Sequence, residues 1–161
     1  MSVAQVHAEA LDGYVVEVDR ILDAGLGVKD TVSRIAEANR TRLGAGFELP
    51  DALRIRHPSA PYTRNLVYAC PRRRFAVIAI VWGPFQETRV HDHLNWCVVN
   101  VLEGRCHSID YERLDDESRS DHARLEIRQT TLVNAGTVQW LLPPPRTNIH
   151  KMANATSEPT I

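Results

Sequence analysis

Histidines at two places in the C-terminal half of the chain could bind a metal ion. His91 and His93 stand two residues apart in a stretch expected to be a strand, so both imidazoles would lie on one face and Asp92 on the other. His150 precedes Asn154 near the end of another expected strand and is the third candidate. Three neutral imidazoles would accept iron, zinc, nickel or copper and leave coordination positions free. The alternative is three unrelated surface histidines.

The strands that would hold these histidines are expected in the last two thirds of the chain, where apolar runs of strand length are separated by turn residues. This spacing favours a mainly β fold, a sandwich or small barrel. Phe75–Trp82 is an unbroken apolar run and is predicted to be buried on both faces. Residues 113–124 are strongly charged and are predicted to be an exposed excursion. The expected strands are Thr63–Ala69, Phe75–Trp82, Thr88–His93, Cys97–Glu103, Arg105–Glu112, Leu125–Thr131, Val138–Leu142 and His150–Asn154.

The first third of the chain has a helical pattern instead. Apolar residues recur at steps of three and four from Val3 to Leu22 and again from Val28 to Leu43, with glycines between the two runs. Pro50–Pro61 is a turn-rich linker. We therefore expect a single domain over residues 1–161, with a helical segment at 1–49 and a β-barrel at 60–161.

Composition excludes several classes of protein. The 161 residues are 43% hydrophobic with a formal net charge of −1, which is enough apolar material for a core and gives no basic field for nucleic acid. The sequence contains no run of about 18 apolar residues, so no membrane span is predicted. The N-terminus lacks the pattern of a secretory signal. Three cysteines are too few for a disulfide framework. These features predict a soluble protein of a reducing compartment, the cytoplasm.

The segment Gly83–Gly104 resembles the first motif of the cupin superfamily, whose fold is a double-stranded β-helix, a jelly-roll barrel. In the general cupin pattern a glutamate ligand follows the His-x-His pair by four residues. Cys97 stands at that position here, and Gly104 falls where the motif expects glycine. The resemblance therefore implies a metal site without its carboxylate ligand.

The segment Gly136–Asn154 resembles the second cupin motif, which implies that His150 is the third metal ligand. Thr147 stands where the family usually has glycine. In the related enzymes a Ser-x-His-x-Tyr run and a last barrel strand follow this motif. Because the sequence stops at Ile161, we expect both to be missing and a longer chain or a partner to cover the sheet edge.

A missing acidic ligand is the mark of the thiol dioxygenase branch of the cupins, of which cysteine dioxygenase is the best-known member. The segment Pro61–Val67 is similar to the one whose arginine, here Arg64, binds the substrate carboxylate there, and Tyr62 would assist it. By strand parity Tyr62, Arg64 and Leu66 share a face. If that face is the barrel interior, Arg64 is a buried cation suited to a carboxylate.

The resemblance implies one Fe(II) per chain, held by His91, His93 and His150, and an activity that adds both atoms of dioxygen to the sulfur of L-cysteine to give the sulfinate. The partners would be a small thiol and dioxygen, with no nucleic acid or membrane. A first alternative is a dioxygenase of 3-mercaptopropionate or another thiol carboxylate, although those relatives tend to have glutamine in place of Arg64. Another is a non-catalytic metal-binding cupin, a sensor or binding module. The oligomeric state stays open.

Three further residues are candidates for the wall of the pocket: Trp96, Cys97 and Met152. In the animal enzymes a cysteine at the position of Cys97 forms a thioether crosslink with a tyrosine, and that tyrosine would lie beyond the end of this sequence. We interpret Cys97 as a small buried apolar residue. Trp96 and Met152 are expected to fill apolar space beside the metal motif.

Overall fold

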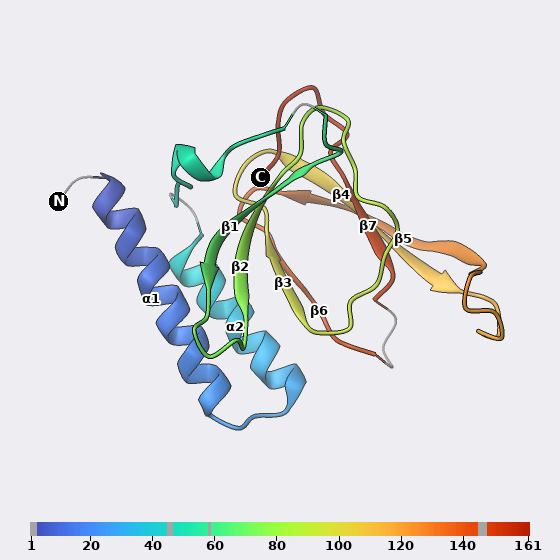
Figure 1. Ribbon diagram of the computed structural model, residues 1–161, viewed down its shortest axis with the longest axis horizontal. Coiled ribbons are helices and arrows are strands. Elements are labelled where there is room, and N and C mark those ends of the chain that lie inside the picture. Colours follow the sequence, from blue (N-terminus) through green and yellow to red (C-terminus); the bar gives the residue numbers. More distant parts are fainter. Residues whose placement is uncertain (1–2, 45–46, 58, 145–147) are drawn as a thin grey trace.

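The computed structural model describes residues 3–44, 47–57, 59–144 and 148–161, with side chains from residue 8 onward (Figure 1). The side chains of Val3 and Val6, and residue Thr147 of the second motif, lie outside this description. The fold is mainly β with two N-terminal helices. The elements are α1 Val3–Asp23, α2 Val28–Arg42, the short 3-10 helix η1 Asp51–Leu53, β1 Thr63–Ala69, β2 Ala76–Val81, β3 Cys97–Asn100, β4 Arg105–Arg113, β5 Leu125–Asn134, β6 Val138–Leu141 and β7 His150–Ala153.

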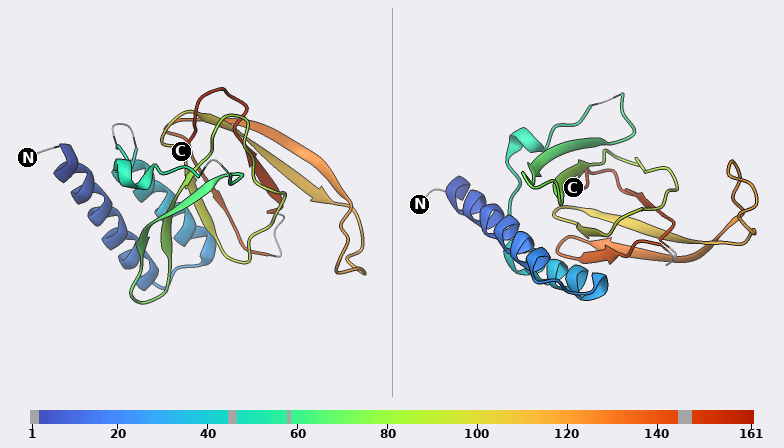
Figure 2. Two further views of the ribbon diagram at one scale, coloured as in Figure 1. Left: turned by 45° about the horizontal axis from the view of Figure 1, so that its top comes forward. Right: turned by 60° about the horizontal axis from the view of Figure 1, so that its bottom comes forward.

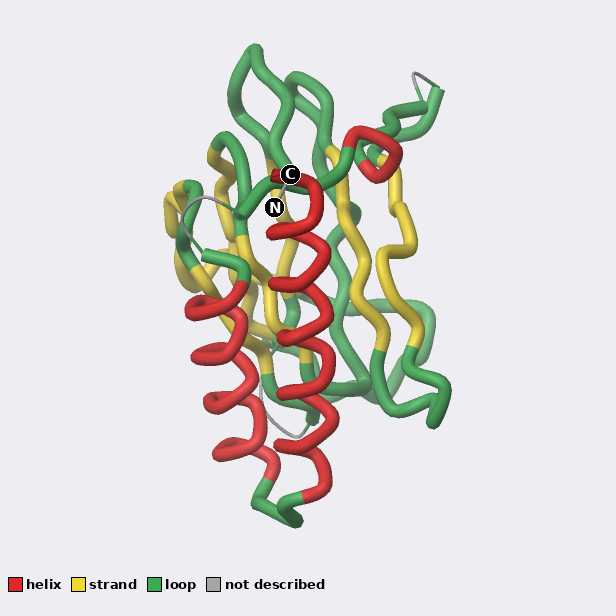
Figure 3. The backbone as a smooth tube through the Cα atoms, turned by 90° about the vertical axis from the view of Figure 1, so that its left-hand side faces the viewer, coloured by secondary structure: helices red, strands yellow, loops and turns green. Residues whose placement is uncertain are grey.

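The two helices lie side by side and cover one side of the strands (Figure 3). Their apolar stripes meet in a core cluster that includes Val18, Ile21 and Ile35, against which Trp96 and Val98 of the β region pack. The two predicted helices are confirmed. Apolar residues spaced three and four apart lie on one face of a helix, and that face can then be buried. Neither helix, over the part that the structure describes, is long and apolar enough to span a membrane.

The strands form three separate antiparallel sets: β1–β2, β3–β6 and β5–β4–β7. Isolated bridges add further pairing: Trp82 pairs with Thr160, and Glu87 and His91 pair with Ala153 and His150 of β7. Within the described residues the strands do not close into a continuous hydrogen-bonded barrel. Figure 2 shows the helices on one side of the molecule and the β4–β5 hairpin extending away on the other.

Two expectations about the strands are wrong. Thr88–His93 is not a strand, because the segment pairs only at the single bridges of Glu87 and His91. The run Phe75–Trp82 contains β2 but is not buried on both faces, since Ile78 is 48% exposed. The physical reason is that, among the described residues, β2 pairs only with β1, and Ile78 lies opposite Leu66, which is also exposed.

The charged segment between β4 and β5 is largely exposed, as the sequence predicts. It is nevertheless ordered around one carboxylate. Asp115 accepts hydrogen bonds from the side chain of Arg113 and from the backbone N–H groups of Glu117 and Arg124. These bonds, that of Arg124 first, lower the pKa of Asp115 to about 2. The excursion is therefore a closed loop rather than a loose chain.

Candidate metal centre

Backbone pairing brings the two histidine segments together. The N–H of His91 donates to the carbonyl of His150 at 2.9 Å, and the N–H of His150 donates to the carbonyl of His91 at 2.8 Å. On its other edge His150 pairs with Asp110 of β4. The bridge therefore fixes His150 between the sheet and the His91 segment, at the point where the two sequence motifs meet.

The three imidazole rings of His91, His93 and His150 lie around one point. Their ring centroids are 4.7 to 5.1 Å apart, and the Nε2 atoms of His93 and His150 are 3.1 Å apart. One ligand atom from each residue lies within 4.8 Å of the others. Over the described part of the chain, no aspartate, glutamate or cysteine belongs to this group.

The protonation states suit a divalent cation. His150 is 4% exposed, and its burial, with the charges of His91 and His93, lowers its pKa to about 4. Burial also lowers the pKa of His93, helped by His91 and Arg64. The Nδ1 atom of His91 lies 2.8 Å from the carbonyl oxygen of Arg89, which can only accept, so Nδ1 carries the proton and Nε2 is free to bind. Three imidazole nitrogen donors fit iron or another first-row metal.

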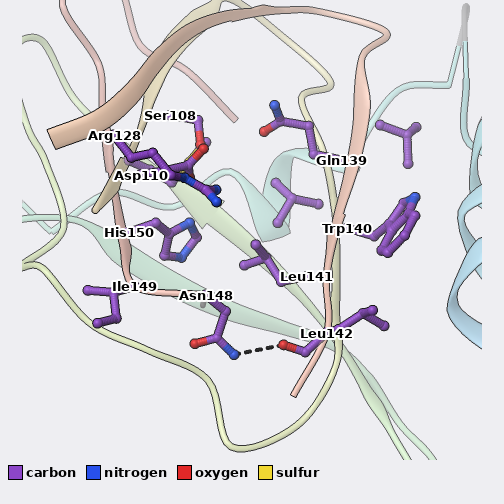
Figure 4. Close-up of a pocket in the computed structure, with 13 residues that line it drawn as sticks. Ser108, Asp110, Arg128, Gln139, Trp140, Leu141, Leu142, Asn148, Ile149 and His150 are labelled. Carbon is purple, nitrogen blue, oxygen red and sulfur yellow. Dashed lines mark hydrogen bonds between the residues drawn. The ribbon is translucent and has the colours of Figure 1, made fainter. Parts of the chain in front are cut away.

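A residue that the sequence analysis missed, Asn148, holds the His93 segment in place. Its side chain is buried, accepts a hydrogen bond from the N–H of His93 at 3.2 Å and donates to the carbonyls of His93 and Leu142, each at 2.8 Å. Figure 4 shows the bond to Leu142. Asn148 stands two residues before His150, and this spacing was the available signal. Asn148 therefore positions the candidate ligand His93 and does not itself belong to the group that could bind the metal.

The structure places Arg64 differently from the sequence expectation. Arg64 is exposed, and the expectation of a buried cation is wrong, because the β1 face that it shares with Leu66 is not covered. Its guanidinium donates a hydrogen bond to the hydroxyl of Tyr62 at 2.9 Å and lies 5.3 Å from the centre of that ring. Arg64 still lines the cavity that contains the three histidines. The pair is therefore held at the edge of that cavity, with Tyr62 half-buried.

The histidine cavity has a volume of about 570 Å³ and extends from the three rings towards the helices. Trp96, Cys97 and Met152 line it, together with apolar residues of β2 and β3. Burial raises the pKa of the Cys97 thiol to about 11, so at neutral pH this thiol is uncharged and a poor metal ligand. The wall is largely apolar and can exclude water from a ligand beside the histidines.

A second cavity of about 400 Å³ adjoins the first at His150 and Met152, and Figure 4 shows the residues that line it. Polar side chains of β4, β5 and β6 line it, among them Asp110, Arg128 and Gln139. His150 and Met152 line both cavities. The sequence analysis did not single out Asp110 or Arg128, because only the pairing of the strands brings them to the metal region.

No known protein-family profile matches the chain. Three solved structures are similar to it in part. A protein with a double-stranded β-helix domain from Klebsiella pneumoniae has a TM-score of 0.47 and 18% identity, over 70% of this chain and 82% of its own. A conserved barrel domain protein of the Cupin 2 type from Salinispora arenicola has a TM-score of 0.47 and 15% identity, over 70% and 80%. The cupin domain of Drosophila melanogaster CENP-C has a TM-score of 0.37 and 11% identity, over 80% and 92%. These resemblances are too distant to carry the chemistry of this chain.

Proposed function

We propose that this protein is a cupin-type thiol dioxygenase that uses Fe(II) to convert L-cysteine into cysteine sulfinate. The observation that carries the proposal is a group of three imidazoles, His91, His93 and His150, with no carboxylate among them in the described structure. A three-nitrogen set leaves positions for a thiolate and for dioxygen, and the sequence motifs that surround it resemble those of thiol dioxygenases.

The reaction balances without any other reductant. A thiol and one dioxygen molecule give one sulfinate and one proton: the sulfur–hydrogen and oxygen–oxygen bonds break, two sulfur–oxygen bonds form, and the four electrons that dioxygen gains come from the sulfur. Bound iron would supply the redox chemistry that lets dioxygen react with the thiolate. The chain itself contributes the three imidazole donors and, through Trp96 and Met152, an apolar wall that keeps water from the sulfur.

Arg64 is the proposed binding group for the substrate carboxylate. It lines the same cavity as the histidines and is close enough to contribute to the lowered pKa of His93. Its hydrogen bond to Tyr62 and its position over the aromatic ring limit the rotation of a long side chain. A restrained guanidinium can hold a carboxylate through two parallel hydrogen bonds and so fix where the thiol lies.

Two other functions use the same site. A dioxygenase of 3-mercaptopropionate would need only the carboxylate contact of Arg64. A non-catalytic metal-binding cupin is supported by the histidine cluster alone. We place the reaction in the cytoplasm, where small thiols stay reduced, and propose no nucleic-acid or membrane partner.

The test is to load the protein with Fe(II) without oxygen and then measure oxygen uptake and sulfinate formation with L-cysteine, 3-mercaptopropionate and cysteamine. We expect L-cysteine to react fastest. Arg64→Gln should raise the KM for L-cysteine by roughly tenfold, the loss of one charge-assisted contact, and leave iron content unchanged. Arg34→Gln, at an exposed position of α2, is the control. Stoichiometric iron with no oxygen uptake from any of the three thiols would contradict the proposal and favour a binding module.

A further inference from the structure

The cavity beyond His150 is lined by several polar side chains. Ser108 is 5% exposed, Asp110 and Gln139 are half-buried and Arg128 is exposed, and all four line the cavity (Figure 4). Within the described residues none of these side chains forms a hydrogen bond or an ion pair. Unpaired polar groups gathered around one cavity are costly unless a ligand or water satisfies them.

The strand register directs these groups to one face. Asp110 lies opposite His150 and Ser108 lies opposite Met152 in the β4–β7 pair, and directly opposed residues project to the same side of a sheet. In the β4–β5 pair, Asp110 lies opposite Gln129 while Tyr111 lies opposite Ile127. Arg128 is therefore the extra residue of a β-bulge. Bulges redirect a side chain, which accounts for an arginine that lines this cavity.

The charges of Asp110 and Arg128 are opposite, yet no ion pair joins them in the described structure. A ligand group with an ammonium and a carboxylate would satisfy both at once, and charge-assisted hydrogen bonds of this kind are the strong ones. Ser108 and Gln139 add neutral donors and acceptors. The chemistry of the cavity is therefore that of an α-amino acid group.

The position of the cavity connects it to the metal centre. His150 and Met152 line both cavities, so the two cavities are adjacent at these side chains. The volume of about 400 Å³ is in the range of sites for small molecules. In the proposed function the thiol and carboxylate of cysteine bind in the other cavity, at the histidines and at Arg64. The second cavity is additional space that cysteine does not need.

We propose that the cavity lined by Ser108, Asp110 and Arg128 binds the α-amino acid end of a thiol substrate longer than cysteine, one in which a second ammonium–carboxylate group extends from the cysteine nitrogen. This inference rests on the proposed function for the placement of the thiol. Arg128 receives the distal carboxylate and Asp110 the distal ammonium group.

The test compares four probes by calorimetry with the Fe(II)-loaded protein under anaerobic conditions: L-cysteine, γ-glutamylcysteine, glutaryl-cysteine without the distal ammonium, and 4-aminobutanoyl-cysteine without the distal carboxylate. We expect γ-glutamylcysteine to bind at least about tenfold more tightly than L-cysteine. Arg128→Gln should weaken γ-glutamylcysteine and glutaryl-cysteine by about tenfold and spare 4-aminobutanoyl-cysteine. Asp110→Asn should weaken γ-glutamylcysteine and 4-aminobutanoyl-cysteine and spare glutaryl-cysteine.

L-cysteine affinity and iron content report on folding in each variant, and Arg105→Gln and Glu112→Gln, on β4 outside the lining of the cavity, are the charge-matched controls. Equal affinity for L-cysteine and γ-glutamylcysteine, or variants that affect all four probes alike, would overturn the inference and leave the proposed function standing. If iron-loaded protein binds none of the four thiols, the proposed function fails and the inference falls with it.

Discussion

The histidine centre and the helix-covered core are stabilised in different ways. In the core, Val18 and Ile35 are almost fully buried among other apolar side chains, so the hydrophobic effect dominates. At the centre the buried groups are polar, and two backbone hydrogen bonds between His91 and His150 and the amide of Asn148 hold them. The core can therefore be altered in stability without changing the metal geometry, whereas the centre depends on a few directional contacts.

A second difference is in the charges. The helix side carries ion pairs in which Arg72 and Arg74 of the β1–β2 turn bind Asp19 and Asp23 of α1. At the centre, by contrast, burial and the neighbouring histidines lower the pKa values of His93 and His150. Charge is used on the exposed side to attach the hairpin to the helix and is suppressed at the centre, where neutral nitrogen is the form that binds metal.

The largest expected effect is the loss of metal in His150→Ala. His150 provides a ring nitrogen for the metal and lines both cavities. Loss of a direct ligand should lower metal affinity by more than the 10- to 100-fold that is typical for residues that only orient a ligand. We expect iron affinity to fall by more than about 100-fold, measured by metal analysis after dialysis. His122→Ala, in the exposed loop, should retain iron. Stoichiometric iron in His150→Ala would contradict its assignment as a ligand.

Ile35→Ala tests the opposite region. The side chain is 0% exposed, and truncation of a buried isoleucine leaves a cavity, so the free energy of unfolding should fall by about 3 kcal/mol. Val16→Ala, at a position 67% exposed on α1, should change stability little. Iron affinity of folded Ile35→Ala should be unchanged. A parallel loss of stability and iron affinity would show that the two regions are not separable.

Asn148→Ala tests whether the directional contacts matter at the centre. It removes one acceptor and two donor interactions that fix His93 against Leu142. We expect iron affinity to fall by about tenfold, the lower range for a residue that orients a ligand. Asn95→Ala, at an exposed position of the loop that contains His93, is the control. An Asn148→Ala protein with normal iron affinity would mean that the two backbone hydrogen bonds between His91 and His150 are enough to position the rings.

The smallest effect concerns pH and the ion pairs. Hydrogen bonds from Arg72 and then Arg74 lower the pKa of Asp23 from 3.8 to about 2. Since the folded-state value is the lower one, this contribution is complete above the unfolded value and is lost as pH falls from about 4 towards 2. Urea unfolding of Asp23→Asn should therefore depend less steeply on pH in this window than that of the unaltered protein, while Asp12→Asn on the same helix should not differ. Identical slopes for all three proteins would argue that the ion pairs are screened by solvent.

Much of the fold was predictable because it depends on local periodicity. The two helices and seven strands follow from the spacing of apolar residues, with ends that differ by a few positions. The convergence of His91 and His93 follows from two-residue alternation, which persists here in an extended segment with a single bridge. Local sequence was sufficient where the structure depends on neighbours along the chain.

The remainder depends on which strands pair, and this information is not local. The sequence could not indicate that β2 has only one partner, so the exposure of Ile78 and Arg64 was predicted wrongly. The same is true of Arg128, whose position depends on a bulge in the β4–β5 register. The one-domain boundary of residues 1–161 and the chemical roles of the site residues stay predictions.

The central claim is that three imidazoles without a carboxylate support transfer of dioxygen to a thiol. Mass spectrometry of the product formed from L-cysteine by the Fe(II)-loaded protein under isotopically heavy dioxygen tests it most directly. The account predicts cysteine sulfinate in which both added oxygen atoms are the heavy isotope. A product with no heavy oxygen, or only the disulfide cystine at the rate of free iron, would contradict the account.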